Sequence, residues 1–321
     1  NMYRRIQQCE ADCEKLPAGP EQDELWRECH RQNAVGMREH AEQAKGLFIK
    51  AGQFLSSLVG ALPDEYSREL LSLTDHLPIS TLEEVFRTIQ KDVHRPPKEV
   101  FSSFERLPIA SASIAQVHKA KLRGTSQVVA VKVQHEGVDR VLLEDVRTLS
   151  TVAGRVAYWA PDIDFTKAVE EMAEALPFEL DFREERRAVD RAGRVIRKAG
   201  NRTIVPRVDK KLFGPHMFVM EFIDSEPIMQ LANKDFCLQH GLDKHTILGT
   251  LLDAFGIMAF KDGMFHADPH PGNVRLSLNK EMPGGAAPVL LDWGHFKEMT
   301  DEERLGLCKV FHALANFDIY G

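Results

Sequence analysis

A ten-residue segment, residues 265–274, restricts the possible folds of this chain more than any other part of it. Its sequence is Phe-His-Ala-Asp-Pro-His-Pro-Gly-Asn-Val. The prolines and the glycine restrict and turn the backbone, so the side chains of Asp268 and Asn273 can face one cavity. A carboxylate and an amide oxygen placed in this way can orient a nucleophile and help to hold a magnesium ion. The alternative is a proline-rich turn in which both side chains only satisfy their own backbone.

A second carboxylate follows shortly downstream, at the end of an apolar strand. Residues 288–291 read Pro-Val-Leu-Leu and lead directly to Asp292, which Trp-Gly follows. A strand that ends in Asp-x-Gly is a weak signal alone. After the Asp-x4-Asn spacing of a protein-kinase catalytic loop it becomes strong, because Asp292 then stands where kinases ligate magnesium. The two segments predict a site for ATP and Mg²⁺, with Asp268 as catalytic residue and Asn273 and Asp292 as metal ligands.

A strand pattern further upstream supplies a matching lysine. Residues 128–134 read Val-Val-Ala-Val-Lys-Val-Gln, like the kinase strand that carries the phosphate-pairing lysine, and this makes Lys132 a second catalytic candidate. Residues 179–185 offer several carboxylates at helical spacing, and one of them can hold Lys132 in an ion pair. The alternative is a strand lysine that extends its ammonium group to solvent.

No glycine-rich phosphate loop precedes Lys132. The equivalent place holds an alanine-rich loop, residues 110–118, which begins Ala110, Ser111, Ala112, Ser113. These residues can still aim backbone N–H groups at phosphate, but their Cβ atoms restrict close approach and positive φ. We expect the four residues to contact the nucleotide, in a loop unlike that of an ordinary protein kinase.

Hydrophobic patterning divides the chain into three parts. Residues 1–100 are predicted to be helical, with a capping box from Ser80 to Glu83. Later the patterns predict strands at 104–108, 115–122, 128–133, 204–208 and 216–223, and helices at 138–159, 165–176, 178–198, 244–261 and from 300 onward. We therefore expect an α+β, two-lobed protein-kinase-like fold. Its parts are a helical extension (1–100), an N-lobe with inserted helices (101–223) and an incomplete C-lobe (224–321).

At these residues the chain resembles the UbiB family of atypical kinases, the aarF-domain kinases associated with coenzyme Q metabolism. The likeness runs from about residue 44 to residue 317. It includes motifs that ordinary kinases lack: Lys50-Ala-Gly-Gln53, the alanine-rich loop, Glu179-Leu-Asp181, and the Asp268 to Asn273 loop.

The resemblance implies a role for several of these positions. Lys132 would pair with Glu185 and contact the nucleotide phosphates. Residues 220–223 would form the hinge whose backbone meets adenine, with Glu221 and Ile223 as the contact residues.

The resemblance also implies how the site is covered. The helix that carries Lys50 and Gln53 would fold over the active site, with Lys50 near Glu179 and Asp181, and would block protein substrates. We therefore expect ATPase activity, small-molecule or lipid-like partners such as quinone precursors or prenyl lipids, and association with a membrane surface.

Two features complicate this interpretation. Trp293 follows Asp292 where the family and kinases generally have phenylalanine, and a buried indole N–H needs a partner. The tryptophan leaves the Asp292 carboxylate, and so its magnesium role, unchanged. It puts in doubt the packing switch that kinases make with the smaller phenylalanine ring at this position. Separately, His266 and His270 flank Asp268 in a pattern that can converge on zinc. Because Asp268 already fits the kinase pattern, we expect both histidines to hydrogen-bond the loop instead.

Composition restricts the partners. A net charge of -7 at pH 7 argues against nucleic-acid binding, which needs a basic surface. Five cysteines are too few for a disulfide framework in 321 residues, and no apolar run reaches membrane-spanning length.

The cellular location rests on the resemblance, which favours the mitochondrion and, as the alternative, the plastid, at a membrane-associated face.

Three functions fit these features. The first is a UbiB-type enzyme that hydrolyses ATP or phosphorylates a small molecule in quinone or prenyl-lipid metabolism. The second is a nucleotide-dependent, pseudokinase-like scaffold that organises a lipid-biosynthetic or membrane complex, as the alanine-rich loop and Trp293 would allow. The third is a small-molecule kinase of the aminoglycoside or choline type, which the Lys50 motif and the alanine-rich loop count against.

Overall fold

The computed structural model describes residues 2–17, 19–44, 63–72, 79–112, 114–159 and 166–316, together with Gly52. The chain divides into two compact units. The first comprises residues 1–80, 111–115 and 135–176, and the second comprises residues 81–110, 116–134 and 177–321. Along the described ranges, no helix is both long and apolar enough to span a membrane.

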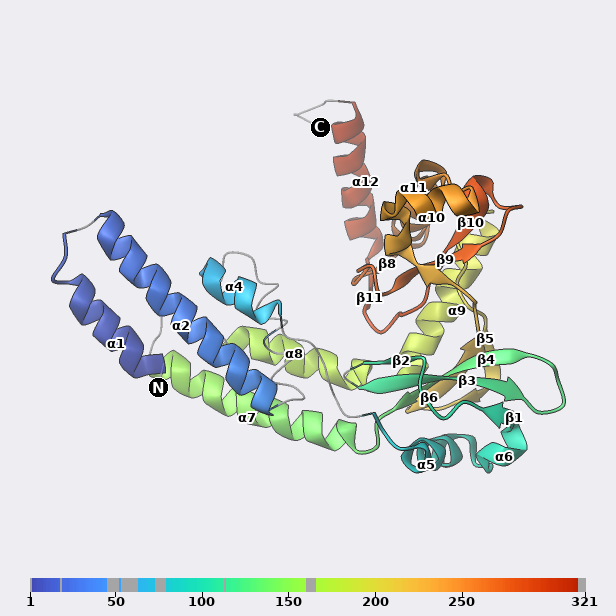
Figure 1. The fold of residues 1–321 in the computed structure, drawn as a ribbon, viewed down its shortest axis with the longest axis horizontal. Coiled ribbons are helices and arrows are strands. Elements are labelled where there is room, and N and C mark those ends of the chain that lie inside the picture. The colour runs from blue at the N-terminus through green and yellow to red at the C-terminus, as the bar shows by residue number, and fades with distance from the viewer. Residues whose placement is uncertain are drawn as a thin grey trace. The chain divides into compact units, whose positions relative to one another are not determined.

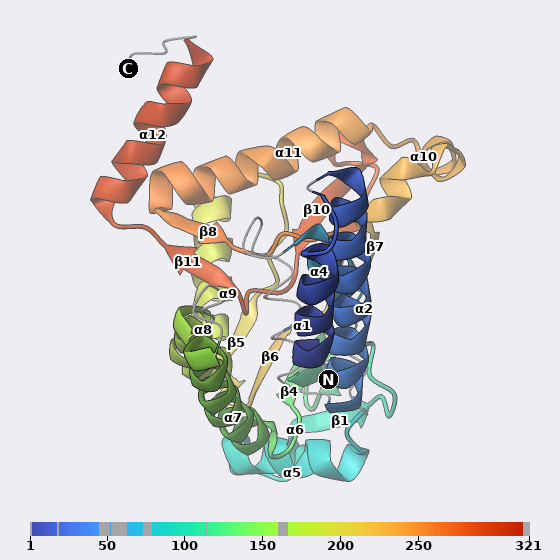
Figure 2. The ribbon, with the colours of Figure 1, turned by 90° about the vertical axis from the view of Figure 1, so that its left-hand side faces the viewer.

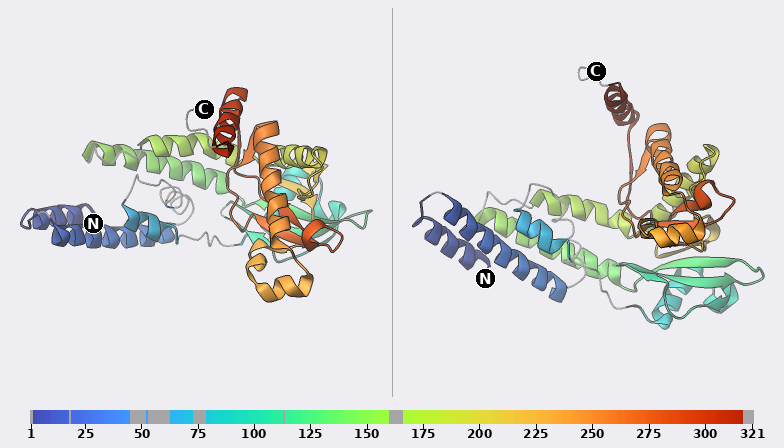
Figure 3. Two further views of the ribbon diagram at one scale, coloured as in Figure 1. Left: turned by 90° about the horizontal axis from the view of Figure 1, so that it is seen from above. Right: turned by 45° about the horizontal axis from the view of Figure 1, so that its top comes forward.

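The first unit is helical. Its described helices are α1 (Met2–Cys13), α2 (Pro20–Ala44), α4 (Asp64–Leu70), α7 (Val138–Trp159) and most of α8 (Thr166–Glu179). Helices α1 and α2 run side by side (Figure 3), because the chain reverses between Cys13 and Pro20, where two prolines and a glycine interrupt the helix. Ala34 and Ala41 of α2 pack against Tyr66 and Leu70 of α4.

An antiparallel sheet with the order β1-β3-β4-β6-β5 forms one half of the second unit, and β2 pairs with β3. The strands are β1 (Phe101–Phe104), β2 (Ala110–Ser111), β3 (Ala115–Leu122), β4 (Val128–Gln134), β5 (Val208–Phe213) and β6 (Met217–Glu221). Figure 1 shows α5 (Leu82–Val93) and α6 (Pro97–Val100) against one face of this sheet and α9 (Phe182–Lys198) on the other side. The core between α5 and the sheet contains Val85, Ile89, Val131 and Met217.

The other half of the second unit surrounds the loop at residues 265–274. Its strands are β7 (Glu226–Pro227), β8 (Met264–His266), β9 (Val274–Leu278), β10 (Ala286–Leu290) and β11 (Phe296–Glu298); its helices are η1 (Ile228–Ala232), α10 (Lys234–His240), α11 (Lys244–Gly256), the π-helical η2 (Ile257–Asp262), η3 (Pro283–Gly285) and α12 (Asp301–Ala315). Figure 2 shows α11 lying along this half, next to β10. Its core joins α9 to α11 and η2 through Val189, Ile196, Ala254 and Met258.

The structure corrects the predicted start of one helix. The capping box of α5 joins Thr81 to Glu84, one residue later than predicted: the Thr81 hydroxyl accepts from the Glu84 N–H, and the Glu84 carboxylate accepts from the Thr81 N–H. Neighbouring Ser80 and Glu83 have the same capping chemistry, so the sequence alone could not fix the frame. Ser80 instead bonds to His135.

Three other boundaries were also predicted wrongly. Pro177 does not separate two helices: α8 continues to Glu179, because a proline in the last turn removes only one helical bond. Strand β1 lies at Phe101–Phe104 rather than at 104–108, where Leu107 is exposed. Ile204 forms only an isolated bridge to Val289, and β5 begins at Val208, after Pro206, which has no N–H to donate.

Candidate functional site

A buried lysine on β4 forms the centre of the site. Val129, Val131 and Val133 pack in the core beneath α5, so the alternation of a strand turns Lys132 to the opposite face. There its ammonium group donates to Glu185 Oε1 at 2.6 Å and to Asp292 Oδ1 at 3.3 Å. Glu185 lies in the first turn of α9, and Asp292 follows β10. The fold thus brings Lys132 together with Glu185, which is 53 residues away in the sequence, and with Asp292, which is 160 residues away.

Burial and charge set the ionisation of this Lys132–Glu185–Asp292 triad. Burial alone would lower the pKa of Lys132, but the two carboxylates outweigh it and hold the pKa above its usual value. Burial would raise the pKa of Asp292, but the Lys132 ammonium and the Gly294 N–H keep it well below its usual range. Burial raises the pKa of Glu185 to about 7, against the opposing effect of Lys132. Lys132 and Asp292 are therefore charged at neutral pH, while Glu185 is close to the midpoint of its titration. The Asp292 side chain is 40% exposed.

The catalytic-loop candidates lie next to Asp292. The backbone N–H of Leu291 donates to the carbonyl of Asn273 at 3.1 Å, so Asn273 lies beside the strand that leads to Asp292. The Asn273 Nδ2 donates to the carbonyl of Asp268 at 3.0 Å, which leaves its amide oxygen as the atom suited to a metal. A Cβ on Gly272 would lie 2.5 Å from the His270 ring, so a larger residue here would displace that ring.

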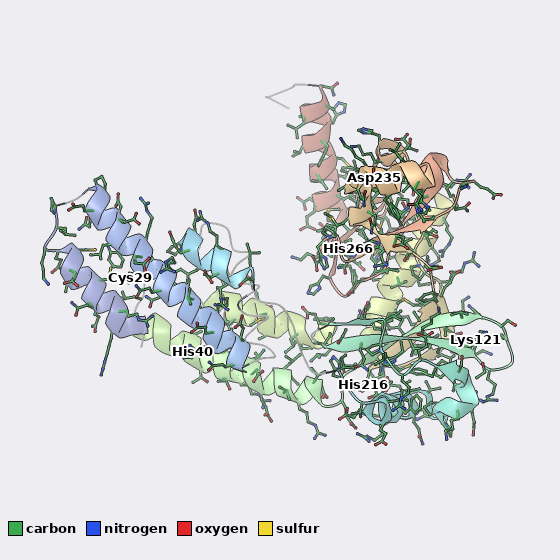
Figure 4. All side chains as sticks on the ribbon, in the orientation of Figure 1. Cys29, His40, Lys121, His216, Asp235 and His266 are labelled. Atoms are coloured by element: carbon green, nitrogen blue, oxygen red, sulfur yellow. The ribbon has the colours of Figure 1, made fainter. Side chains whose placement is uncertain are left out.

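Two histidines of the loop are hydrogen-bonded within this region. His266, labelled in Figure 4, lies at the end of β8; its Nδ1 accepts from the Asp268 N–H, and its Nε2 bonds to the carbonyl of Asp292. His270 Nδ1 accepts from the Gly272 N–H. Among the described residues, no three His, Cys, Asp or Glu side chains are placed to hold one metal ion. The bonding gives the zinc interpretation no support.

The bonding of His266 predicts how stability depends on pH. Since Nδ1 accepts and the carbonyl needs a donor, the ring is neutral with its proton on Nε2. Burial lowers its pKa below the ordinary 6.5. A lowered histidine pKa contributes stability above the unfolded value, and this stability is lost as the pH falls below 6.5. Urea unfolding is measured at pH 7.5 and pH 5.5, about one unit above and below that pKa. When the pH is lowered, the wild-type protein should lose more free energy of unfolding than His266→Gln. A parallel decline in both proteins would contradict this assignment.

Trp293 is fully buried behind the triad. Its ring packs against His266 with a centroid distance of 5.0 Å, and its backbone N–H is 3.5 Å from Glu185 Oε1. The indole N–H is buried and has no hydrogen-bond partner in the described part of the chain. The tryptophan thus fills a core position at the cost of one unsatisfied donor.

Two substitutions measure these opposing contributions of Trp293. Trp293→Phe removes the unsatisfied donor but leaves a small cavity, so we expect unfolding free energy within about 1 kcal/mol of wild type. Trp293→Ala opens a large cavity and should cost about 3–5 kcal/mol. Denaturant unfolding of both variants tests this. If both lose the same free energy of unfolding, removal of the unsatisfied indole N–H brings no compensating gain in stability.

The remaining predicted residues are distributed as follows. Ala110, Ser111 and Ala112 are exposed at and after β2, and Ser113 is outside the described residues. Glu221 ends β6, with its N–H donating to the Arg207 carbonyl at 2.8 Å, and Ile223 follows two residues later.

The predicted regulatory residues that the structure describes have hydrogen-bond partners. Asp181 caps α9 by accepting from the Arg183 N–H. Glu179 Oε1 lies 3.1 Å from His295 Nε2, and the carbonyl of His295 accepts from the Ala267 N–H beside Asp268. His295 was not predicted, although its place directly after Asp-Trp-Gly was a usable signal. Lys50 and Gln53 lie outside the described residues, so their position over the site remains a prediction.

A cavity of about 440 Å³ lies elsewhere on the sheet of the second unit. It shares Glu221 with the predicted hinge but contains none of the triad residues. Its lining consists of residues 127, 129, 207–211 and 219–221. The cavity is therefore separate from the chemistry at Lys132.

These features define a kinase-like α+β fold whose strand lysine, helix glutamate and strand-end aspartate are joined in one buried network. The ABC1 atypical kinase-like domain family matches residues 72–321, and the chain belongs to this family.

Similar proteins agree with this classification. The chain is 35% identical over 307 residues to AarF domain-containing protein kinase 1 of Gallus gallus. This match covers 95% of this chain and 58% of that protein. It is 32% identical to AarF domain-containing kinase 1 of Drosophila melanogaster, over 85% of this chain and 52% of that protein. The chain thus spans little more than half the length of these relatives. The solved complex of Rv3197 with erythromycin, from Mycobacterium tuberculosis, has a TM-score of 0.57 and 30% identity, and the match covers 86% of this chain and 68% of that one.

Proposed function

We propose that this chain is an ATP-dependent atypical kinase or ATPase of the UbiB type, which binds Mg-ATP and acts on a small molecule rather than a protein. The observation that carries the proposal is the Lys132–Glu185–Asp292 triad. In active kinases, a lysine ammonium that is paired with a glutamate is presented to the nucleotide phosphates. In this chain, the Lys132 ammonium lies 2.6 Å from the buried Glu185 carboxylate.

The donor atoms suit magnesium. Asp292 has an ionised, partly exposed carboxylate, and the Asn273 amide oxygen on the neighbouring segment has no hydrogen-bond partner among the described residues. Hard cations such as Mg²⁺ prefer such oxygen ligands. When bound, the metal would neutralise charge on the phosphates.

The chain's own residues supply the other steps. Glu185 keeps Lys132 in place while the ammonium exchanges Asp292 for a phosphate oxygen. Asp268 orients the attacking water or hydroxyl and accepts its proton. The neutral His266 fixes the backbone on both sides by bonding to Asp268 and Asp292.

The substrate class is the finer part of the proposal. The family resemblance points to quinone precursors or prenyl lipids at a membrane surface, in the mitochondrion or the plastid. The complex of one relative with erythromycin supports a small-molecule ligand in this family. The competing proposal is a nucleotide-dependent scaffold, which the unusual alanine-rich loop favours.

Purified protein separates the two proposals. For the enzyme, we expect thermal stabilisation by ATP that requires Mg²⁺, together with slow phosphate release that responds to added lipid or quinone precursor. Mass spectrometry of the candidate acceptor with labelled ATP then distinguishes transfer from hydrolysis. Binding without turnover under every condition would favour the scaffold, and absence of binding would refute both.

A further inference from the structure

The cavity on the sheet of the second unit is not used by the proposed chemistry. All of its lining residues belong to that unit, so its shape is defined within one compact body. Its volume of about 440 Å³ is within the range of small-molecule sites, which is about 300–1,000 Å³. It is therefore large enough to hold a small organic molecule.

The cavity arises from a bulge in β5, the strand at the edge of the sheet next to β6. Val208 pairs with Met220 and Phe213 pairs with Phe218, so four residues of β5 (209–212) stand opposite a single residue of β6. A bulge of this size bends the edge strand away from its neighbour. The space between β5 and β6 is thus a consequence of the strand register.

Hydrogen bonds within β5 hold the bulge in place. The Asp209 carboxylate accepts from the N–H groups of Lys211 at 2.7 Å and Leu212 at 2.9 Å, which closes a turn inside the strand. The Asp209 carbonyl accepts from Arg186 Nε at 3.3 Å, and the Leu212 side chain packs against the core beneath α5. The cavity is therefore formed without a ligand, as most small-molecule sites are.

The cavity has an apolar floor and a basic rim. Val129 and Val219 line it from the buried core, whereas Arg207, Lys210 and Lys211 are exposed. Within the ranges that the structure describes, none of these three cationic side chains forms an ion pair or a hydrogen bond. Three unpaired cations thus meet at one apolar cavity, in a chain whose net charge is -7.

The two ends of the cavity differ in charge. Glu221 is next to Arg207, whose backbone N–H donates to Glu221 Oε2 at 3.4 Å. Along β6, Glu221 is two residues from Val219, which corresponds to roughly 7 Å. The end at the bulge, with Lys210 and Lys211, is therefore positive, and the far end carries a carboxylate. An anion is attracted to the first end and repelled from the second.

We infer that this cavity is a second ligand site, which binds a small anion with an apolar body, such as an aryl phosphate or an aryl carboxylate. The anionic group lies against Lys210 and Lys211, where it forms charge-assisted hydrogen bonds. The apolar body covers Val129 and Val219 and is removed from water there. None of these residues belongs to the triad, so the inference does not depend on ATP binding by this chain.

Three probes separate the contributions of the two parts of such a ligand. Naphthyl phosphate has an anionic group and an apolar body, naphthol lacks the charge, and inorganic phosphate lacks the apolar body. In calorimetric titrations, naphthyl phosphate should bind at least about tenfold more tightly than either of the other two. Saturating Mg-ATP should leave its affinity within about twofold, because the cavity contains no triad residue.

A double variant tests the basic end. Lys210→Gln with Lys211→Gln should weaken naphthyl phosphate at least about tenfold and leave the affinities for naphthol and Mg-ATP unchanged. Both positions are exposed, so we expect the variant to fold. The matched control is Lys234→Gln with Lys280→Gln, two exposed lysines elsewhere in the same unit, which should change none of these affinities.

A variant at the acidic end should have the opposite effect. Glutamine at position 221 can still accept from the Arg207 N–H but does not repel an anion. Glu221→Gln should therefore bind naphthyl phosphate about threefold more tightly, as the repulsion of unit charges roughly 7 Å apart in water implies. The affinity for naphthol should not change.

Several results would overturn this inference. The cavity is not such a site if naphthyl phosphate does not bind at millimolar concentration, or if it binds no better than naphthol or inorganic phosphate. Displacement of naphthyl phosphate by Mg-ATP, with equal affinity in wild type and the double lysine variant, would assign the probe to the nucleotide site instead. If the double lysine variant does not fold, Glu221→Gln decides, and an unchanged affinity refutes the inference.

Discussion

Replacing Asp292 by asparagine is expected to abolish the stabilisation of this protein by Mg-ATP while leaving the fold intact. Asparagine has the same shape and can still accept from the Gly294 N–H, but it lacks the charge that attracts the metal. Residues that only support a metal ligand are worth about 10–100-fold in affinity, so loss of a ligand charge should cost at least about 100-fold. Thermal shift and calorimetry with Mg-ATP measure the effect.

The control for Asp292→Asn is a carboxylate in the same unit that lies away from the site. Asp190 lies on α9 and forms an exposed pair with Arg194, so Asp190→Asn should leave nucleotide binding unchanged. Mg-ATP affinity that survives Asp292→Asn at the wild-type level would show that the metal does not bind at Asp292.

Replacing Lys132 by methionine is expected to lower the stability of the second unit strongly. The substitution leaves Glu185 and Asp292 together without their shared cation, and breaking a buried ion pair in this way costs about 3–5 kcal/mol. Denaturant unfolding at pH 8 measures the loss, because Glu185, with its pKa near 7, is mostly ionised at that pH in wild type.

A double variant tests whether the loss arises from the stranded charge. Lys132→Met with Glu185→Leu replaces the buried pair by apolar groups, which is often neutral in stability. We expect the double variant to recover most of the stability lost by Lys132→Met and to bind no Mg-ATP. If Lys132→Met alone costs less than about 1 kcal/mol, the triad is not the buried network described above.

The α+β kinase-like fold and the family were predictable from the sequence, and both are confirmed. The strand of Lys132 was predicted almost to its boundaries, because its apolar run has the pattern of a strand buried on both faces. The α7 boundaries, Val138 to Trp159, were also predicted from helical periodicity. Such strong local patterns survive tertiary packing.

Other features could not be predicted because they depend on contacts distant in the sequence. The tautomer of His266 follows from Asp292, 26 residues away, and the pairing of Glu179 with His295 spans 116 residues. The burial of Trp293 without a partner for its N–H depends on the packing of α9 and α11 around it. Roles for the predicted site residues, and the placement of Lys50, remain predictions.

The central claim, that the triad serves Mg-ATP, is tested most directly by a crystal structure with Mg²⁺ and a non-hydrolysable ATP analogue. We expect a metal about 2.0–2.1 Å from oxygens of Asp292 and Asn273. We also expect Lys132 to keep its bond to Glu185 and to exchange Asp292 for a phosphate oxygen. A nucleotide bound away from Lys132, with the Lys132–Asp292 contact unchanged, would contradict this claim.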